Sequence, residues 1–326
     1  MAADENLSCE KSDFMKDPVG DKNTVSQKKN NSVLVAYFLL VLSVLFWSGN
    51  FVVARGIHEV VQPATLAFLR WSLALVIFLP FTFRKLVRNR RIIIKHWSSI
   101  ALFGLLSVAG FSILIYMALD RTTVVNTALV NSFYPILIVI GSWVGFSDRI
   151  TLRQCIGVIA SFSGLMWILS KGQFSVLLEL RFAEGDLLTL AAGASWALYS
   201  VLLRKRPQEL DHFTFLAAMM VFGTFCLFPI FLWEIFNTGL PRYLPQALGG
   251  ILYVAVFPSI LSYLCWNKGV EKVGANRAGI FVHLIPVFSI LMAVMLLGER
   301  LQYFHIPGMA LIFSGIFLTT FVGGSS

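Results

Sequence analysis

Long apolar segments alternate with short polar segments along the chain from about residue 33 to residue 322. An apolar run of about 20 residues is long enough to cross the hydrocarbon core of a bilayer as an α-helix. Such runs recur here more often than the core of a soluble protein requires. The pattern predicts an all-α integral membrane protein with ten transmembrane helices. We place these helices at residues 33–54, 63–83, 97–118, 124–146, 151–170, 185–204, 212–233, 246–267, 275–297 and 304–322.

One stretch of the sequence occurs twice: Ala118 to Leu165 matches Gly269 to Ile316 at an offset of 151 residues. Identity is low, six of 48 positions, but the matches are mostly prolines, glycines and charged residues at helix breaks. They are Pro135 with Pro286, Asp148-Arg149 with Glu299-Arg300, Gly157 with Gly308, and Phe162-Ser163-Gly164 with Phe313-Ser314-Gly315. Such residues set the geometry of a helical hairpin, so the match indicates a duplicated fold unit.

The helices upstream of this stretch repeat as well, at an offset of 149 residues. Trp47 matches Trp196, Arg55 matches Arg204, and Pro80 matches Pro229. Because five helices are an odd number, the second copy must insert upside down relative to the first. The sequence therefore predicts two inverted five-helix repeats, over residues 33–170 and 184–322. Inverted repeats are characteristic of secondary transporters, whose substrate site lies near the midplane between the halves.

The 26 lysines and arginines are divided unequally between the two sides of the predicted membrane. Nineteen fall on the side of the N-terminus, six fall on the opposite side, and Arg70 lies inside a span. Cytoplasmic loops carry the excess of Lys and Arg, so both termini are predicted to be cytosolic. Residues 1–32 are polar and predict a disordered cytosolic tail. No cleaved secretory signal is expected.

The composition agrees with a membrane protein, because 57% of the residues are hydrophobic and only 13% are charged. Soluble domains carry about 25% charged residues. The net charge of +9 is explained by basic residues that flank the helices, so no nucleic-acid partner is expected. The four cysteines have no paired spacing and predict neither a disulfide framework nor a metal site. No phosphate loop, zinc-ligand cluster or nucleophile set appears. We expect no cofactor and no enzyme activity.

Three motifs resemble signatures of the EamA family, which is part of the drug/metabolite transporter superfamily. Trp47 to Val52 resembles the family's first-helix signature, and Leu66 to Arg70 resembles its second-helix arginine motif. The strongest likeness runs from Pro286 to Arg300 and on to Ser314-Gly315, and the first half repeats it with Asp148 where Glu is more usual. The resemblance covers about residues 33 to 322.

The resemblance implies that helices 1–4 and 6–9 surround a central cavity and that helices 5 and 10 lie at the periphery. It also implies movement of small metabolites, often the export of amino acids or related compounds, without fixing the substrate. The family is abundant in bacterial inner membranes, where we expect this multi-pass protein. A eukaryotic membrane is the alternative location.

Arg70 lies about eight residues into its predicted helix and has no acidic residue nearby in the sequence. A charge at that depth costs about 2.5 kcal/mol or more. Its guanidinium could bind a substrate carboxylate as a fork, or it could bond to neighbouring helices and hold the fold. The repeat counterpart, Met219, is uncharged, which favours the substrate role. The recurrence of the motif in relatives with different substrates favours the structural role.

Polar and aromatic residues at helical spacing predict further faces of the cavity. Tyr263 and Asn267 are four residues apart and therefore share one side of a helix. The other candidates are Trp47 and Asn50 in helix 1, Ser112 and Tyr116 in helix 3, Asn131 and Tyr134 in helix 4, and Trp196 and Tyr199 in helix 6. Packing and hydrogen bonds between helices explain such residues as well.

His283 is placed deep in helix 9, whereas all 17 acidic residues fall in the tail or near helix ends. It is therefore the candidate for proton coupling as well as for substrate binding. The alternative is a histidine that is hydrogen-bonded between helices.

Other residues are candidates for gating or packing. Pro135 and Pro286 each remove a backbone hydrogen bond and predict kinks in helices 4 and 9. Asp148 and Glu299 end these helices on opposite sides of the membrane, where we expect each to stabilise a gate. Small residues in helices 5 and 10 predict close packing, within the chain or across a homodimer.

These features favour a secondary transporter that moves a small metabolite by alternating access around a central cavity, with an exported amino acid or related compound as the first expectation. A nucleotide-sugar transporter or a drug/cation transporter of the same superfamily is the alternative. A receptor or scaffold that transports nothing would not need duplicated gates. A membrane enzyme would need a paired acid and base, and the sequence offers none.

Overall fold

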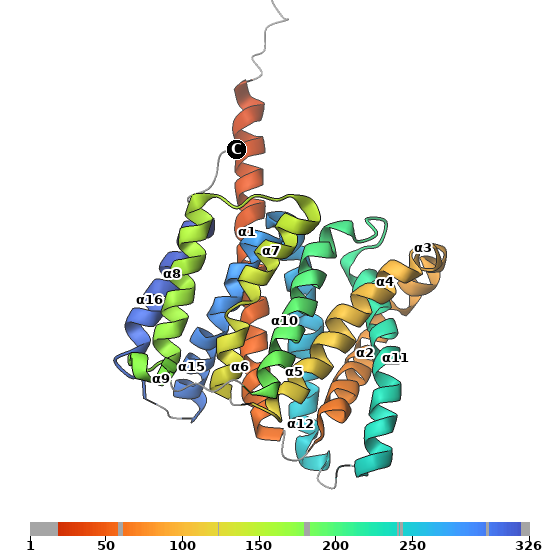
Figure 1. Cartoon of the computed structure of the whole chain (residues 1–326). Coiled ribbons are helices and arrows are strands. Elements are labelled where there is room, and N and C mark those ends of the chain that lie inside the picture. The colour runs from red at the N-terminus through yellow and green to blue at the C-terminus, as the bar shows by residue number, and fades with distance from the viewer. Residues whose placement is uncertain are drawn as a thin grey trace, which may run out of the picture.

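The computed structural model describes residues 19–57, 61–122, 124–178, 183–239, 241, 244–297 and 300–320. All regular elements in these ranges are helices, and they form one bundle (Figure 1). Nine of the described segments are long and apolar enough to cross a membrane, and the shorter helix His305–Thr320 is apolar too. The predicted all-α membrane fold is confirmed.

Five predicted spans make up the first half. Its helices are α1 Val19–Ile57, α2 Pro63–Arg88, α3 Arg90–Lys95, α4 Trp97–Phe103, the π-helix η1 Gly104–Gly110, α5 Phe111–Leu119, α6 Val124–Asn131, α7 Tyr134–Phe146, α8 Leu152–Leu169 and α9 Phe174–Leu178. The third span is α4, η1 and α5 in series, and the fourth is α6 and α7.

The second half repeats this plan. Its helices are α10 Glu184–Leu202, the 3₁₀ helix η2 Leu203–Lys205, α11 His212–Thr238, α12 Leu244–Val254, the π-helix η3 Ala255–Leu261, α13 Ser262–Val273, α14 Ala275–Gly279, the 3₁₀ helix η4 Ile280–His283, α15 Leu284–Leu297 and α16 His305–Thr320. The eighth span is α12, η3 and α13, and the ninth is α14, η4 and α15.

The first helix differs from its prediction. Residues 1–18 lie outside the described residues, but residues 19–32, which were predicted to be disordered, form the first turns of α1. Figure 1 shows this part of α1 extending beyond the rest of the bundle. The polar residues from Asp21 to Ser32 include no proline or glycine, so no helix breaker separates them from the apolar span that follows.

The internal repeat extends to irregularities that the sequence does not reveal. Each π-helix has seven residues, and η3 begins and ends 151 residues after η1. The interruption of the fourth span at Ser132 and Phe133 likewise corresponds to His283 and Leu284, at the end of η4. Because π-helices are rare and occur frequently at functional sites, their equivalent positions show that the wide turn belongs to the duplicated unit.

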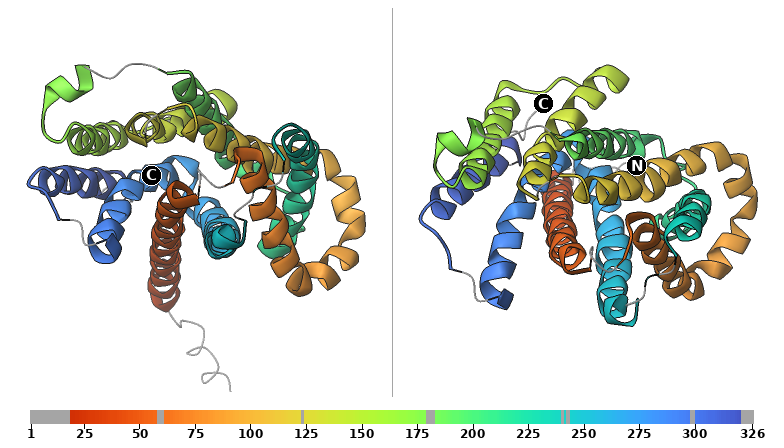
Figure 2. Two further views of the ribbon diagram at one scale, coloured as in Figure 1. Left: turned by 90° about the horizontal axis from the view of Figure 1, so that it is seen from below. Right: turned by 60° about the horizontal axis from the view of Figure 1, so that its bottom comes forward.

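Helices α8 and α16 pack against each other at one edge of the bundle, at the left of Figure 1 and again at the left of both views in Figure 2. A Cβ atom on Gly157 would lie 2.6 Å from the Gly315 carbonyl oxygen, and one on Gly164 would lie 2.5 Å from that of Gly308. Glycine is therefore required for the two backbones to approach this closely. The sequence left open whether Gly157 and Ser161 of α8 and Ala310 and Ser314 of α16 pack within the chain or across a homodimer. Gly157 and Ser161 are buried against α16, whereas Ala310 and Ser314 are exposed.

Candidate substrate cavity

A cavity lies inside the bundle and is lined by residues from both repeats. The lining residues are Trp47, Asn50, Arg70, Phe111, Ile115, Asn131, Tyr134, Trp196, Tyr263, Val282 and Ile285. The space among them is about 550 Å³, including its opening, but the centre of a water molecule can move through only about 40 Å³ of it. The cavity therefore has room for a few water molecules in this conformation.

Arg70 supplies the charge of this cavity. Its side chain is buried, with 2% of the residue exposed. Nε donates a hydrogen bond to Ser259 Oγ at 2.6 Å, and Nη1 donates one to Tyr116 Oη at 3.0 Å. Nη2 has no hydrogen-bond partner and the guanidinium has no ion-pair partner among the described residues. A buried cation thus retains donor capacity where it lines the cavity.

Hydrogen bonds extend from Arg70 to a second polar residue of the wall. The Tyr116 hydroxyl, which accepts from Arg70, lies 3.4 Å from Asn50 Oδ1 and donates to it. Ser259, the other partner of Arg70, donates to the Val254 carbonyl at 2.7 Å. Each partner therefore accepts from the guanidinium and passes its own proton to a further acceptor, which fixes the direction of the guanidinium plane.

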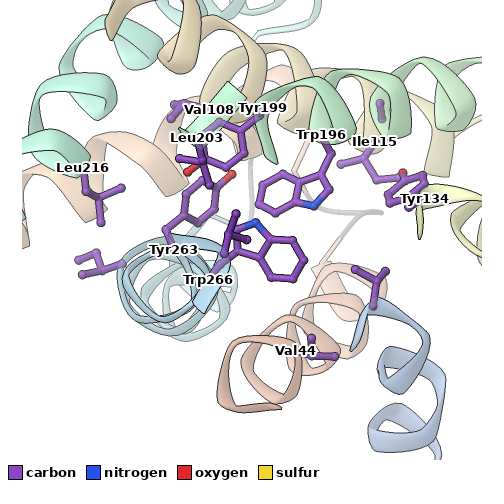
Figure 3. Packing of buried hydrophobic residues seen from close by; sticks show 14 of the residues in the cluster. Val44, Val108, Ile115, Tyr134, Trp196, Tyr199, Leu203, Leu216, Tyr263 and Trp266 are labelled. Atoms are coloured by element: carbon purple, nitrogen blue, oxygen red, sulfur yellow. The ribbon is translucent and has the colours of Figure 1, made fainter. Parts of the chain in front are cut away.

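Aromatic rings make up much of the remaining wall. Trp47 and Trp196 meet edge to face with ring centroids 4.9 Å apart, and Trp196 meets Tyr263 in the same way at 5.5 Å. Trp266 packs behind them, 5.3 Å from Trp47 and 5.6 Å from Trp196. Figure 3 shows Trp196, Tyr263 and Trp266 gathered from α10 and α13. Rings in this arrangement form a rigid apolar surface.

The two π-helices hold two of these rings in place. The Ser107 carbonyl in η1 accepts a hydrogen bond from the Tyr263 hydroxyl at 2.7 Å. The Pro258 carbonyl in η3 accepts one from Trp47 Nε1 at 3.0 Å. Ser107 and Pro258 are repeat counterparts, 151 residues apart. Each repeat therefore offers the same backbone carbonyl to an aromatic residue of the other repeat, and both aromatic residues line the cavity.

The helix breaks that the prolines predict are also present, and both reach the cavity. Proline has no N–H to bond the carbonyl four residues earlier, which is Asn131 for Pro135 and Val282 for Pro286. Helix α6 ends at Asn131, and Val282 lies within the 3₁₀ helix η4. Asn131 and Val282 both line the cavity. The side-chain oxygen Oδ1 of Asn131 is buried and has no hydrogen-bond partner among the described residues.

The structure brings together most of the residues that the sequence singled out. Trp47, Asn50, Arg70, Asn131, Tyr134 and Tyr263 line the cavity, and Tyr116 is bonded to two of them. The two remaining candidates, Tyr199 and Asn267, lie behind the wall. Tyr199 Oη donates a hydrogen bond to Asn267 Oδ1 at 2.5 Å. Tyr199 also packs against the rings of Trp196 and Tyr263. Tyr199 therefore supports the aromatic wall from behind and does not line the cavity.

His283 does not lie among the residues that line the cavity. Its Nδ1 is 2.7 Å from Ser161 Oγ, and its Nε2 is 3.0 Å from the carbonyl oxygen of Ser132, its own repeat counterpart. Only 1% of the residue is exposed. The side chain joins the two helix breaks to α8, which is the alternative that the sequence left open. Its geometry does not support the predicted roles in substrate binding and proton coupling.

The predicted gating residues are placed as follows. Asp148 forms an ion pair with Arg204 at 2.9 Å, and the Arg204 guanidinium also lies 4.4 Å from the centroid of the Phe146 ring. This contact joins the end of α7 to the end of α10. Glu299 lies outside the described residues. Whether either residue forms a gate stays a prediction.

Several lining residues have no signal in the sequence. Phe111, Ile115, Val282 and Ile285 are apolar residues in apolar spans, and composition does not separate them from residues that face lipid. Ser259 is 189 residues from Arg70 along the chain. Phe111 and Ile115 are four residues apart, as are the adjacent candidates Ser112 and Tyr116. This spacing is the one feature of the sequence that links Phe111 and Ile115 to the cavity.

Comparison with known proteins now adds to this geometry. The model of the EamA-like transporter family matches residues 34–170 and, a second time, residues 183–321. The chain belongs to the EamA-like transporter family. It is thus a multi-pass membrane transporter made of two EamA domains and is not an enzyme. The two matches coincide closely with the repeats predicted at 33–170 and 184–322.

Relatives agree over almost their whole length. An uncharacterized transporter of Bacillus subtilis, YyaM, is 26% identical over 86% of this chain and 92% of its own length. An uncharacterized transporter of Archaeoglobus fulgidus is 28% identical over 87% and 96%. A solved crystal structure matches with a TM-score of 0.72 and 19% identity, over 89% of this chain and 96% of that one. At that identity the likeness shows the fold alone.

Proposed function

We propose that this EamA-family transporter carries a small metabolite with an anionic group, an amino acid or a related carboxylate, by alternating access around the cavity at Arg70. Transport is then secondary or passive, since the connections between the predicted helices are too short for a nucleotide-hydrolysing domain. The family resemblance favours export as the direction of transport. In this proposal both chain termini lie in the cytosol. The proposal rests chiefly on one observation, the buried and unpaired guanidinium of Arg70.

The buried charge of Arg70 favours an anion as the substrate. An uncompensated charge deep in a membrane protein is costly, so such a residue usually has a partner or a functional role. The described residues offer Arg70 two hydroxyl oxygens and the face of the Trp71 ring, 5.1 Å from Cζ, but no carboxylate. A substrate carboxylate at Nη2 would supply both the missing negative charge and the missing acceptor.

The rest of the wall favours a small substrate with an apolar part. The aromatic rings of Trp47, Trp196 and Tyr263 offer apolar surface beside Arg70, and the amide groups of Asn50 and Asn131 offer polar contacts. The part of the cavity that the centre of a water molecule can reach is only about 40 Å³, which favours a metabolite of amino-acid size over a nucleotide sugar.

Counterflow in proteoliposomes tests the proposal. Vesicles that contain the purified chain are loaded with a mixture of unlabelled amino acids and diluted into a trace of labelled ones. Vesicles without protein serve as the control. We expect labelled amino acid to accumulate transiently without any imposed gradient. Free amino acids should compete with the label, whereas their methyl amides, which lack the carboxylate, should not.

Two outcomes would contradict the proposal. Exchange that the methyl amides inhibit as well as the free acids would remove the anionic group from the recognition, although a carrier would remain. Folded protein that exchanges no amino acid but exchanges organic cations or nucleotide sugars would replace the proposed substrate class. A pH gradient imposed in the same vesicles would report whether protons are coupled to transport.

A further inference from the structure

A second hollow of the molecule lies at the surface, between α1 and α13. It measures about 530 Å³, including the space that opens outward, and is lined by Asn31, Ser32, Val35, Ala36, Leu39, Lys268 and Lys272. It shares no residue with the substrate cavity. The apolar span of α1 begins at Asn31, and α13 ends at Val273. The hollow therefore lies where the apolar part of both helices ends, at the level of lipid headgroups.

The hollow is lined mainly by apolar atoms, and two exposed lysines border it. Lys268 and Lys272 are one helical turn apart, so their side chains share a face of α13. Neither forms an ion pair with a described residue. Glu271, the acid between them in sequence, is bonded by Arg206 at 2.8 Å and by His212 at 2.6 Å. The two ammonium groups are thus available to an external anion.

The apolar part of the groove comes from α1, where Val35, Ala36 and Leu39 line it. Beside it the two helices touch, because a Cβ atom on Gly269 would lie 2.6 Å from the side chain of Leu40. Gly269 lies between Lys268 and Lys272 in sequence, so this contact closes the space between the helices at the level of the lysines. An apolar groove beside a pair of cations is complementary to a molecule with an anionic head and a hydrocarbon chain.

We propose that this groove binds one anionic phospholipid, with its phosphate at Lys268 and Lys272 and the start of an acyl chain along Val35 and Leu39. Basic pockets between transmembrane helices bind anionic lipid headgroups in this way. A free phosphate ion would use the lysines but would leave the apolar residues of the groove uncovered, so the lipid is the occupant that fits both the charge and the apolar lining. The site is independent of the substrate proposal, because none of its residues lines the cavity.

Native mass spectrometry of the full chain in detergent tests the site. The protein is titrated with dioleoyl phosphatidylglycerol, which is anionic, and with dioleoyl phosphatidylcholine, which is zwitterionic. We expect one phosphatidylglycerol to bind in preference to phosphatidylcholine. Each lysine near a membrane surface contributes about 1 kcal/mol toward anionic lipid, so the double variant Lys268→Gln/Lys272→Gln should bind phosphatidylglycerol about thirty-fold more weakly.

Two further variants separate this site from general attraction between charges. Val35 is 53% exposed, so Val35→Trp should fold normally, fill the groove and abolish the preference while it keeps both lysines. Arg88→Gln/Arg91→Gln removes two exposed cations at the ends of α2 and α3 and should bind as the wild type does. The proposal would be overturned by equal binding of both lipids, by wild-type binding in Val35→Trp, or by an equal loss in the Arg88 and Arg91 variant. Thermal unfolding of each variant serves as the folding control.

Discussion

Helices α2 and α11 are repeat counterparts that pack along each other, and the two ends of this pair are built differently. Residues 85 and 234 are counterparts at an offset of 149, but one is lysine and the other is glutamate. Lys85 forms an exposed ion pair with Asp211 at 3.5 Å. Glu234 accepts hydrogen bonds from the backbone N–H groups of Ala64 and Thr65, at 3.0 and 2.6 Å, and from the Thr65 hydroxyl at 2.8 Å.

These bonds give Glu234 the role of a helix cap. Asp211 caps α11 from its own N-cap position, by accepting from the N–H groups of Phe213 and Thr214. Gln62, its repeat counterpart at the N-cap of α2, makes no such bond. The carboxylate of Glu234 therefore satisfies the free N–H groups of α2 from another helix, where the helix dipole also favours a negative charge.

The cost of removing this cap can be worked from its parts. Loss of a capping side chain costs about 1 kcal/mol, and loss of a carboxylate at a helix N-terminus costs about 0.3–1 kcal/mol more. The third bond, from the buried Thr65 hydroxyl, adds roughly 1 kcal/mol. Glu234→Ala should therefore destabilise the protein by about 2–3 kcal/mol. Lys85→Ala, at the counterpart position, removes an exposed ion pair and should cost less than about 1 kcal/mol.

Equilibrium unfolding in mixed micelles of mild detergent and sodium dodecyl sulfate, followed by tryptophan fluorescence, measures both free energies under the same conditions. Glu234→Gln is the matched intermediate, because it keeps one acceptor oxygen and loses the charge, and its cost should fall between those of the other two variants. The reasoning fails if Glu234→Ala costs no more than Lys85→Ala, or if Glu234→Gln costs as much as Glu234→Ala.

Three further predictions follow from the fold and the cavity. Arg70→Gln should lose exchange of anionic substrates and Arg70→Lys should retain part of it, with both variants folded by thermal unfolding; unchanged exchange in Arg70→Gln would exclude a substrate role. Gly157→Val should separate α8 from α16 and destabilise the protein by about 1–3 kcal/mol, whereas Gly145→Val, which meets no atom within 4 Å, should cost far less; equal costs would contradict the packing. Partial burial raises the pKa of Asp211, but hydrogen bonds from Thr214 and Phe213 and the Lys85 ammonium outweigh it and lower the pKa. Its stabilisation should therefore be complete above the unfolded pKa of about 3.9 and be lost as pH falls toward the folded value, and Asp211→Asn should lack this loss in acid titrations of stability.

Much of the fold could be predicted from the sequence because its signals are repeated. The apolar spans and the two offsets of 151 and 149 residues placed both repeats within a few residues of the matched family domains. Prolines gave a partial signal: the missing N–H groups of Pro135 and Pro286 coincide with helix interruptions, whereas Pro80 and Pro229 lie inside the continuous helices α2 and α11. The π-helices were not predictable, because Gly104–Gly110 and Ala255–Leu261 share no residue type that requires a wider turn.

The site was predicted less completely than the fold, for a physical reason. A polar residue in an apolar span stands out, so Arg70, Asn50 and Asn131 could be found by residue type alone. The sequence indicates how deep a residue lies in its span, but it does not indicate toward which neighbouring helix the side chain points. His283 was predicted to lie deep in its span, but it faces Ser161 and the Ser132 carbonyl and does not line the cavity. Such partners are set by packing between helices that are distant in sequence.

The measurement that tests the central claim most directly is counterflow through a protein whose cavity has been filled. Ile285 lines the cavity, and Ile285→Trp would occupy its narrow space. Ile159, on α8, is 64% exposed, and Ile159→Trp adds the same side chain outside the cavity. With both variants folded and reconstituted equally, we expect Ile285→Trp to exchange labelled substrate no faster than empty vesicles and Ile159→Trp to match the wild type. Wild-type exchange by Ile285→Trp would contradict the assignment of this cavity as the substrate path.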